Sequence, residues 1–190
     1  MVSNSKILIK VMSLIYTIGH STRSIQEFIQ LLTTHHIQLV IDVRRYASSR
    51  RFPQFNKGDL QESLYQNKIG YKHYEVLGGR RGAPNPQSLN DGLQDEGIRA
   101  YADYINTVEG RKAVDWLSET TANYRLALLC AEALPLKCHR NIIADVLVAK
   151  GMNVFHILDK NKTGVHKLHQ QARLLNDGRV IFPNEQERLF

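Results

Sequence analysis

The chain has 190 residues, of which 43% are hydrophobic and 23% are charged, and its formal net charge is +7 with a pI of about 9.5. This balance excludes a disordered or fibrous protein, and at this length one core can fold without disulfides or a structural metal. No apolar run is long enough to cross a bilayer. We therefore expect a cytoplasmic protein with reduced thiols, no membrane partner and no disulfide-linked partner.

The first elements of the chain predict a βαβ unit. Residues 14–18 form a short β-branched and aromatic run that is typical of a buried strand. Ser24 and Glu27 have the spacing of a capping box, which begins a helix with one apolar face. Residues 39–43 predict the next apolar strand, so strand, helix and strand follow one another over some 30 residues.

The same alternation continues along the chain. The later predicted elements are, in chain order, a helix over 56–70 with Asn56 as its cap and Gly70 closing it, a strand over 71–76, a loop over 78–84, a helix over 98–121 with a break near Gly110, a strand over 126–130, a helix over 139–150, a strand over 154–158 and a short helix around 165–175. Strands that alternate with crossover helices predict a three-layer, Rossmann-like α/β fold with a mostly parallel sheet of about five strands.

Three segments follow from these elements. Residues 1–13 are predicted to be an N-terminal extension, and residues 14–158 to be a single α/β domain. Residues 159–190 are a basic C-terminal segment that either packs on the domain or trails from it.

Positive charge is concentrated between residues 40 and 81, where nine Lys or Arg residues minus four acidic residues leave +5. A run of charge is often only a solvated face. Alternatively, it marks a surface for nucleic acid or another phosphorylated ligand. Aromatic residues within this stretch suit stacking on nucleobases, although aromatic residues near strands more often belong to the core. They are Tyr46, Phe52, Phe55, Tyr71 and Tyr74.

Polar residues follow the predicted strands at the carboxyl ends, where open parallel sheets bind their ligands. Each residue alone has a structural interpretation, such as a turn histidine or one half of an ion pair. Together, at one edge of the sheet, they predict a site. In chain order they are His20, Ser21, Asp42, Arg44, Ser49, Arg50, Arg51, Gly79, Arg80, Arg81, Cys130, Glu132, Cys138, His139 and Arg140.

Arginines and serine hydroxyls at one edge suit a phosphate, because guanidinium groups bind its oxygens in pairs. The helix predicted to begin near His139 adds main-chain N–H donors. Asp42, Glu132 and His20 are the predicted catalytic groups, since carboxylates among cations can activate water. Substrate binding is assigned to Ser21, Arg44, Ser49, Arg50, Arg51, Phe55, Tyr71, Gly79, Arg80, Arg81 and Arg140.

The leading hypothesis is a hydrolytic enzyme that acts on a nucleic acid or a nucleotide, for instance of DNA-repair or base-excision type. The first alternative is a DNA- or RNA-binding module without chemistry. The second is an enzyme that depends on a thiol or a metal at the cysteines and nearby histidines.

Cys130 and Cys138 leave several interpretations open, because their C-x7-C spacing differs from the C-x-x-C of a redox pair or a zinc knuckle. Cys138 at a helix start beside His139 is a candidate nucleophile with a depressed thiol pKa. The loop of phosphatases is absent, since Leu136 stands where that loop needs an arginine six residues after Cys130. No cofactor is predicted, and a metal held by the cysteines, His139 and His20 is the less favoured alternative.

These motifs resemble a family known as domain of unknown function 488. The resemblance runs from about Ile15 to Leu158, and only Ala47 departs from it, at a place where the family has a proline that stiffens the loop. The matching motifs lie at 16–21 (YTIGHS), 42–44 (DVR), 49–51 (SRR), 53–56 (PQFN), 77–81 (LGGRR), 130–132 (CAE) and 138–140 (CHR). The resemblance implies a parallel α/β domain whose motif residues meet in one cleft, and it implies no established substrate or reaction.

Overall fold

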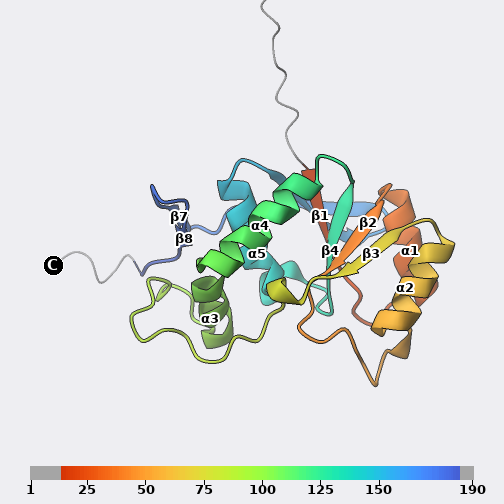
Figure 1. The fold of residues 1–190 in the computed structure, drawn as a ribbon, viewed down its shortest axis with the longest axis horizontal. Helices are drawn as coiled ribbons and strands as arrows, with labels where there is room; N and C mark the ends of the chain where they lie inside the picture. The colour runs from red at the N-terminus through yellow and green to blue at the C-terminus, as the bar shows by residue number, and fades with distance from the viewer. Residues whose placement is uncertain (1–13, 185–190) are drawn as a thin grey trace, which may run out of the picture.

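A six-stranded sheet separates two layers of helices in the computed structural model, which describes residues 14–184 (Figure 1). The strand order is β3-β2-β4-β1-β5-β6, in which the first five strands are parallel and β6 runs antiparallel to β5. The strands are β1 (Leu14–Gly19), β2 (Leu39–Asp42), β3 (Gly70–His73), β4 (Leu126–Cys130), β5 (Asn153–Asp159) and β6 (Lys162–Val165). The predicted three-layer, mostly parallel fold is confirmed, with β6 as a further strand.

The C-terminal part of the chain adds a second, smaller sheet, and both ends of the chain lie outside the described residues. A small second sheet pairs β7 (Arg173–Leu174) with β8 (Val180–Ile181). The predicted N-terminal extension over 1–13 lies outside the described residues, as do residues 185–190 of the predicted C-terminal segment. Within the described part of the chain, no helix is long and apolar enough to span a membrane.

Helices cover both faces of the sheet because its central strands are apolar on both sides. One face carries α1 (Ile25–Thr34) and α2 (Lys57–Gln66), and the other carries α3 (Glu96–Ile105), α4 (Val108–Thr120) and α5 (Arg140–Ala149) (Figure 1). Alternate side chains of β1 join the two cores. Ile18 packs in the cluster with Phe28 and Leu60, whereas Ile15 packs in the cluster with Tyr101 and Leu147.

Local signals set several element boundaries. The capping box of α1 is present: the Ser24 Oγ accepts from the Glu27 N–H at 3.2 Å, and the Glu27 carboxylate accepts from the Ser24 N–H at 2.8 Å. The helix predicted over 98–121 is two helices, and the predicted break lies at residues 106–107, three residues before Gly110, with Thr107 as the N-cap of α4. Gly110 lies in the first turn of α4, where a Cβ would stand 2.5 Å from the Tyr104 carbonyl oxygen.

Two predicted elements differ from the structure. The third strand ends at His73, and residues 75–77 form a 3₁₀ turn. The helix predicted around 165–175 is wrong, because β6 ends at Val165 and residues 173–174 form β7. Polar groups in this segment bind α5 and do not pair along a helix: the His166 Nε2 and the His169 N–H both donate to the Asp145 carboxylate, at 2.9 Å and 2.8 Å.

The C-terminal segment also contributes to the core. Ala172, Val180 and Phe182 are buried in the cluster beneath α3, α4 and α5. Because β4 lies between β1 and β2, the loops that follow these three strands adjoin at one edge of the sheet. This topology brings together residues that are more than 100 positions apart in the sequence.

Candidate functional site

A cleft of about 1410 Å³ opens at the carboxyl edge of the sheet, between the loops after β1, β2 and β4 and the start of α3. It is lined by most of the residues that the sequence predicts for the site. They are His20, Ser21, Arg44, Ser49, Arg50, Arg51, Gly79, Arg80, Cys130, Glu132, Cys138 and His139. The remaining five predicted residues, Asp42, Phe55, Tyr71, Arg81 and Arg140, lie outside this lining.

Asp42 lies at the end of β2 and is fully buried. Its Oδ1 accepts from the Arg44 main-chain N–H at 3.1 Å and from the Arg44 Nε at 2.8 Å. Its Oδ2 accepts from the Arg44 Nη2 at 2.5 Å and from the Tyr71 hydroxyl at 2.8 Å. Both oxygens are therefore engaged inside the protein, and the carboxylate holds Arg44 in place at the cleft.

Charge and burial together shift the pKa values of Arg44 and Tyr71, the two partners of Asp42. Burial alone lowers the pKa of Arg44, but the hydrogen bonds and the charge of Asp42 raise it above its ordinary value, so the guanidinium stays cationic. Burial and the Asp42 charge raise the pKa of Tyr71, which keeps its hydroxyl protonated as a donor. The Arg44 Nη2 also donates to the Phe55 carbonyl oxygen at 2.8 Å.

His20 follows β1 and is nearly buried. Its ring stacks on Phe55, with centroids 4.3 Å apart and an angle of 16° between the planes, so Phe55 supports His20 from the core. Burial and the Arg44 charge lower the pKa of His20 from 6.5 to about 4. The ring is neutral at pH 7, with Nδ1 3.0 Å from the Ser21 carbonyl oxygen, which accepts its proton, and Nε2 3.4 Å from the Arg44 Nη1.

Three exposed arginines line the cleft without an internal counter-charge. Within residues 14–184, none of Arg50, Arg51 and Arg80 has an ion-pair partner. Arg45, also in the lining, is paired with Glu75 at 3.2 Å. Because these three arginines outnumber the two acidic residues of the lining, Asp95 and Glu132, the cleft keeps an excess of positive charge and is suited to an anion.

The backbone of the cleft is strained at two positions. Ser21 and Arg80 have φ values of 50° and 58°, in the left-handed region that non-glycine residues adopt at a cost in free energy. Arg81 points away from the cleft: its guanidinium donates to the carbonyl oxygens of Gly78 and Val76 and lies 3.5 Å above the Tyr104 ring. The neighbouring arginines thus differ, since Arg80 lines the cleft and Arg81 stabilises the loop through hydrogen bonds to its carbonyl oxygens.

The loop after β2 is held by side chains. The Ser49 Oγ accepts from the Phe52 N–H at 3.0 Å, and the Ser49 N–H donates to the Asn56 Oδ1 at 2.7 Å. Asn56 is the N-cap residue of α2, as predicted, but its side chain makes no capping bond and supports this loop instead. These bonds fix the segment that carries Arg50 and Arg51.

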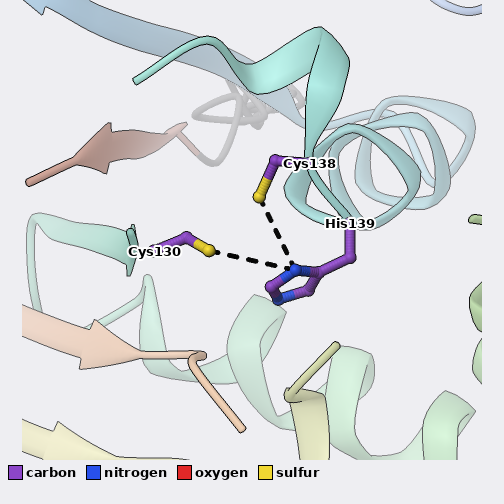
Figure 2. Close-up of side chains that lie close together, drawn as sticks. All are labelled: Cys130, Cys138 and His139. Carbon is purple, nitrogen blue, oxygen red and sulfur yellow. Dashed lines mark hydrogen bonds between the residues drawn. The ribbon is translucent and has the colours of Figure 1, made fainter. Parts of the chain in front are cut away.

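Cys130, Cys138 and His139 form a group in the lining of the cleft, and their side chains converge on one another (Figure 2). Cys130 ends β4, whereas Cys138 and His139 lie where α5 begins. The His139 Nδ1 lies 3.9 Å from the Cys130 Sγ and 3.6 Å from the Cys138 Sγ. Both cysteines are free thiols.

The pKa values of the two thiols are shifted in opposite directions. The hydrogen bond between them, with Cys130 as donor, raises the pKa of Cys130 and lowers the pKa of Cys138. Burial raises the pKa of Cys130 further, and for Cys138 it acts against the lowering. The nearby His139 and the Arg140 charge also lower the pKa of Cys138.

Arg140 is buried beneath the cleft and holds its wall together. Its Nε donates to the Cys138 Sγ at 3.4 Å, and its Nη2 donates to the Glu132 carbonyl oxygen. Glu132 itself is exposed and lines the cleft. Of the two carboxylates predicted to be catalytic, only Glu132 has this access.

The sequence did not indicate the wall formed by the start of α3. Asp95, Gly97, Ile98 and Tyr101 line the cleft there. The Tyr101 ring packs edge-on against His139, with centroids 4.9 Å apart. The helix was predicted, but no local pattern in the sequence indicates which loops its start meets.

Fold and site together define an α/β protein with a cationic, thiol-containing cleft at the carboxyl edge of a parallel sheet. The chain belongs to the family described as domain of unknown function DUF488, whose model matches residues 24–147, so the resemblance seen in the motifs is confirmed. His20 and Ser21 precede the matched range. No curated protein and no solved structure matches the chain.

Proposed function

We propose that the protein is an enzyme directed at a nucleic acid or a nucleotide, that it binds the phosphates of this ligand in the cleft, and that the reaction is hydrolytic. The observation that carries the proposal is the group of exposed arginines, Arg50, Arg51 and Arg80, which line one cleft and have no ion-pair partner among residues 14–184. Guanidinium groups bind phosphate oxygens in pairs, and unpaired ones retain that capacity.

The size and lining of the cleft favour this class of ligand. Its volume of about 1410 Å³ exceeds the roughly 300–1,000 Å³ of pockets that bind small molecules. Tyr46, which is 64% exposed, and Phe52 line the cleft among the arginines. Aromatic faces beside cations suit stacked bases. Of the aromatic residues for which stacking is predicted, Phe55 packs on His20 and Tyr71 binds Asp42, so we assign the role to the two that line the cleft, Tyr46 and Phe52.

The roles that we assign to the two predicted catalytic carboxylates, Glu132 and Asp42, depend on whether each one reaches the cleft. We assign the general base to Glu132, which can accept a proton from a water in the cleft, since the other exposed carboxylate of the lining, Asp95, caps α3 through its Oδ1. Asp42 acts through Arg44, which it holds by two oxygens, and is therefore a positioning residue.

A binding module without chemistry is the second candidate. It is favoured by the engagement of two predicted catalytic groups, because Asp42 is buried in its ion pair and His20 is held between Ser21 and Arg44. Both candidates share the arginine-lined cleft, and turnover separates them.

The test uses the untagged full chain with single-stranded DNA, duplex DNA, RNA and free nucleotides. Binding is measured by fluorescence anisotropy between about 50 and about 200 mM salt, and products are identified by mass spectrometry. We expect binding that weakens with salt and a hydrolysis product that Glu132→Gln lowers at least about 100-fold without loss of binding. Glu119→Gln, an exposed change on α4, is the matched control.

Two results would contradict the enzyme. Salt-dependent binding with no product from any of these ligands would assign the cleft to a binding module. Binding that does not respond to salt would reject a nucleic-acid ligand altogether.

A further inference from the structure

We propose that Cys130, Cys138 and His139 bind one zinc-class cation in the wall of the cleft, with a fourth coordination position open toward the ligand. This inference goes beyond the proposed function, since the ion would bind whether the cleft holds a nucleic acid, a nucleotide or neither. The site draws one ligand from the end of β4 and two from the start of α5 (Figure 2).

The separations of the three ligand atoms fit a tetrahedral ion. With Zn–S bonds of about 2.3 Å and Zn–N bonds of about 2.0 Å, tetrahedral angles place nitrogen and sulfur roughly 3.5 Å apart and two sulfurs roughly 3.8 Å apart. The His139 Nδ1 lies 3.6 Å from the Cys138 Sγ and 3.9 Å from the Cys130 Sγ, and all three atoms lie within 4.8 Å of one another. The two nitrogen–sulfur distances lie within about 0.4 Å of the tetrahedral value, and the two sulfurs lie at most about 1 Å further apart than a tetrahedral ion places them.

The histidine is already oriented for coordination. Its Nε2 lies 2.9 Å from the Val43 carbonyl oxygen, which can only accept, so Nε2 carries the proton. In the neutral ring this leaves the Nδ1 lone pair directed at both sulfurs. A hydrogen bond from the second ring nitrogen to a backbone carbonyl is the usual support of a metal-bound histidine. The edge-on contact with Tyr101 fixes the ring from the other side.

Gly79 leaves the space beside this nitrogen free. A Cβ at that position would stand 2.9 Å from the His139 Nδ1, closer than side-chain atoms pack. The glycine of the loop after β3 therefore lets the backbone pass over the ligand atom without covering it.

The charges and the access of the group favour a cation with an anionic fourth ligand. Two thiolates neutralise a divalent ion, and the Arg140 Nε, 3.4 Å from the Cys138 Sγ, adds one positive charge. Thiolate and imidazole together select zinc-class ions over magnesium or calcium. All three ligand residues line the cleft, and a set of three protein ligands with an open position is typical of catalytic zinc.

The test is a titration of the reduced, untagged full chain with Zn²⁺ and with Co²⁺, followed by metal analysis after dialysis. We expect one ion per chain and, with Co²⁺, thiolate charge-transfer bands together with the intense visible bands of tetrahedral coordination. Cys138→Ser should weaken Zn²⁺ binding at least about 100-fold. Gly79→Ala keeps every ligand but places a methyl group 2.9 Å from the His139 Nδ1, so it should displace the ring and weaken binding by about 10- to 100-fold, the size of effect that changes around a metal-ligating side chain have.

His36→Asn is the matched control, because His36 is exposed and outside the cleft, and its binding of Zn²⁺ should equal that of the natural chain. The proposal is overturned if the reduced natural chain takes up neither ion, or if Co²⁺ binds without thiolate bands. Failure of the reduced chain to bind metal, together with rapid closure of a Cys130–Cys138 disulfide under mild oxidant, would assign the pair to redox chemistry instead. The titration of the natural chain decides these outcomes even if a variant fails to fold.

Discussion

Two polar groups contact α5, and they differ in whether their hydrogen bonds are completed inside the protein. One is the cleft with its arginines and the Cys130, Cys138 and His139 group. The other, the histidine chain, consists of Thr17, His156, His166 and Asp145, and it joins β1, β5 and the end of β6 to α5.

Every ring nitrogen of the histidine chain has a partner. The Thr17 Oγ1 lies 2.7 Å from the His156 Nδ1, the His156 Nε2 lies 2.9 Å from the His166 Nδ1, and the His166 Nε2 lies 2.9 Å from the Asp145 Oδ1. The His166 Nε2 donates to Asp145, since the carboxylate can only accept. None of the four residues lines the cleft.

The cleft has the opposite character. Arg50 and Arg80 line it without ion-pair partners in the part of the chain that the structure describes, and Arg80 has a strained backbone. Histidines and charged groups are present in both places, so residue type alone does not identify a site. The comparison indicates that polar side chains whose hydrogen bonds are all made inside the protein stabilise the fold. Polar side chains that keep unused hydrogen-bond donors and face solvent are candidates for binding.

The largest expected effect is on the histidine chain. Asp145→Ala leaves the buried His166 Nε2–H and the His169 N–H without their acceptor, so we expect the free energy of unfolding to fall by about 3–5 kcal/mol in urea denaturation. Asp145→Asn keeps an acceptor and should lose less than half as much. Asp115→Ala removes an exposed ion pair and should cost about 1 kcal/mol or less. Equal losses from Asp145→Ala and Asp115→Ala would refute the structural role.

A smaller effect is expected from acid. Burial lowers the pKa of His156 and of His20 from 6.5 to about 4. Above pH 6.5 both rings are neutral whether the chain is folded or not. As the pH falls from 6.5 toward 4, the unfolded chain takes up protons first, so each ring lowers the free energy of unfolding by about 1–3 kcal/mol. Denaturation midpoints that stay constant across this range would contradict the buried, neutral rings, and His156→Gln should flatten the dependence.

Much of the fold was predictable because its signals are local. The capping box at Ser24 and the continuous apolar runs of β2 and β4 each specify an element without reference to the rest of the chain. The helix around 165–175 was predicted wrongly because its polar groups bind Asp145, which is about 20 positions away. Long-range bonds of this kind have no periodicity.

The candidate site was predictable in its location and less so in its details. The rule that ligands bind at the carboxyl ends of parallel strands collected His20, Arg44, Cys130 and Cys138 from distant parts of the chain, and all four line the cleft. It did not distinguish Asp42, which lies beneath the cleft and pairs with Arg44, from Glu132, which reaches the cleft. That difference depends on side-chain direction, which spacing does not specify.

The most direct test of the central claim, that this cleft binds phosphates, is the slope of the logarithm of nucleic-acid affinity against the logarithm of salt concentration. The Arg50→Gln, Arg80→Gln double variant should reduce the slope by about 2, one phosphate contact for each arginine. The Lys112→Gln, Lys167→Gln variant removes the same charge from exposed residues outside the cleft and should leave the slope unchanged. Equal slopes for the natural chain and the arginine variant, or an equal loss in both variants, would contradict a phosphate-binding cleft.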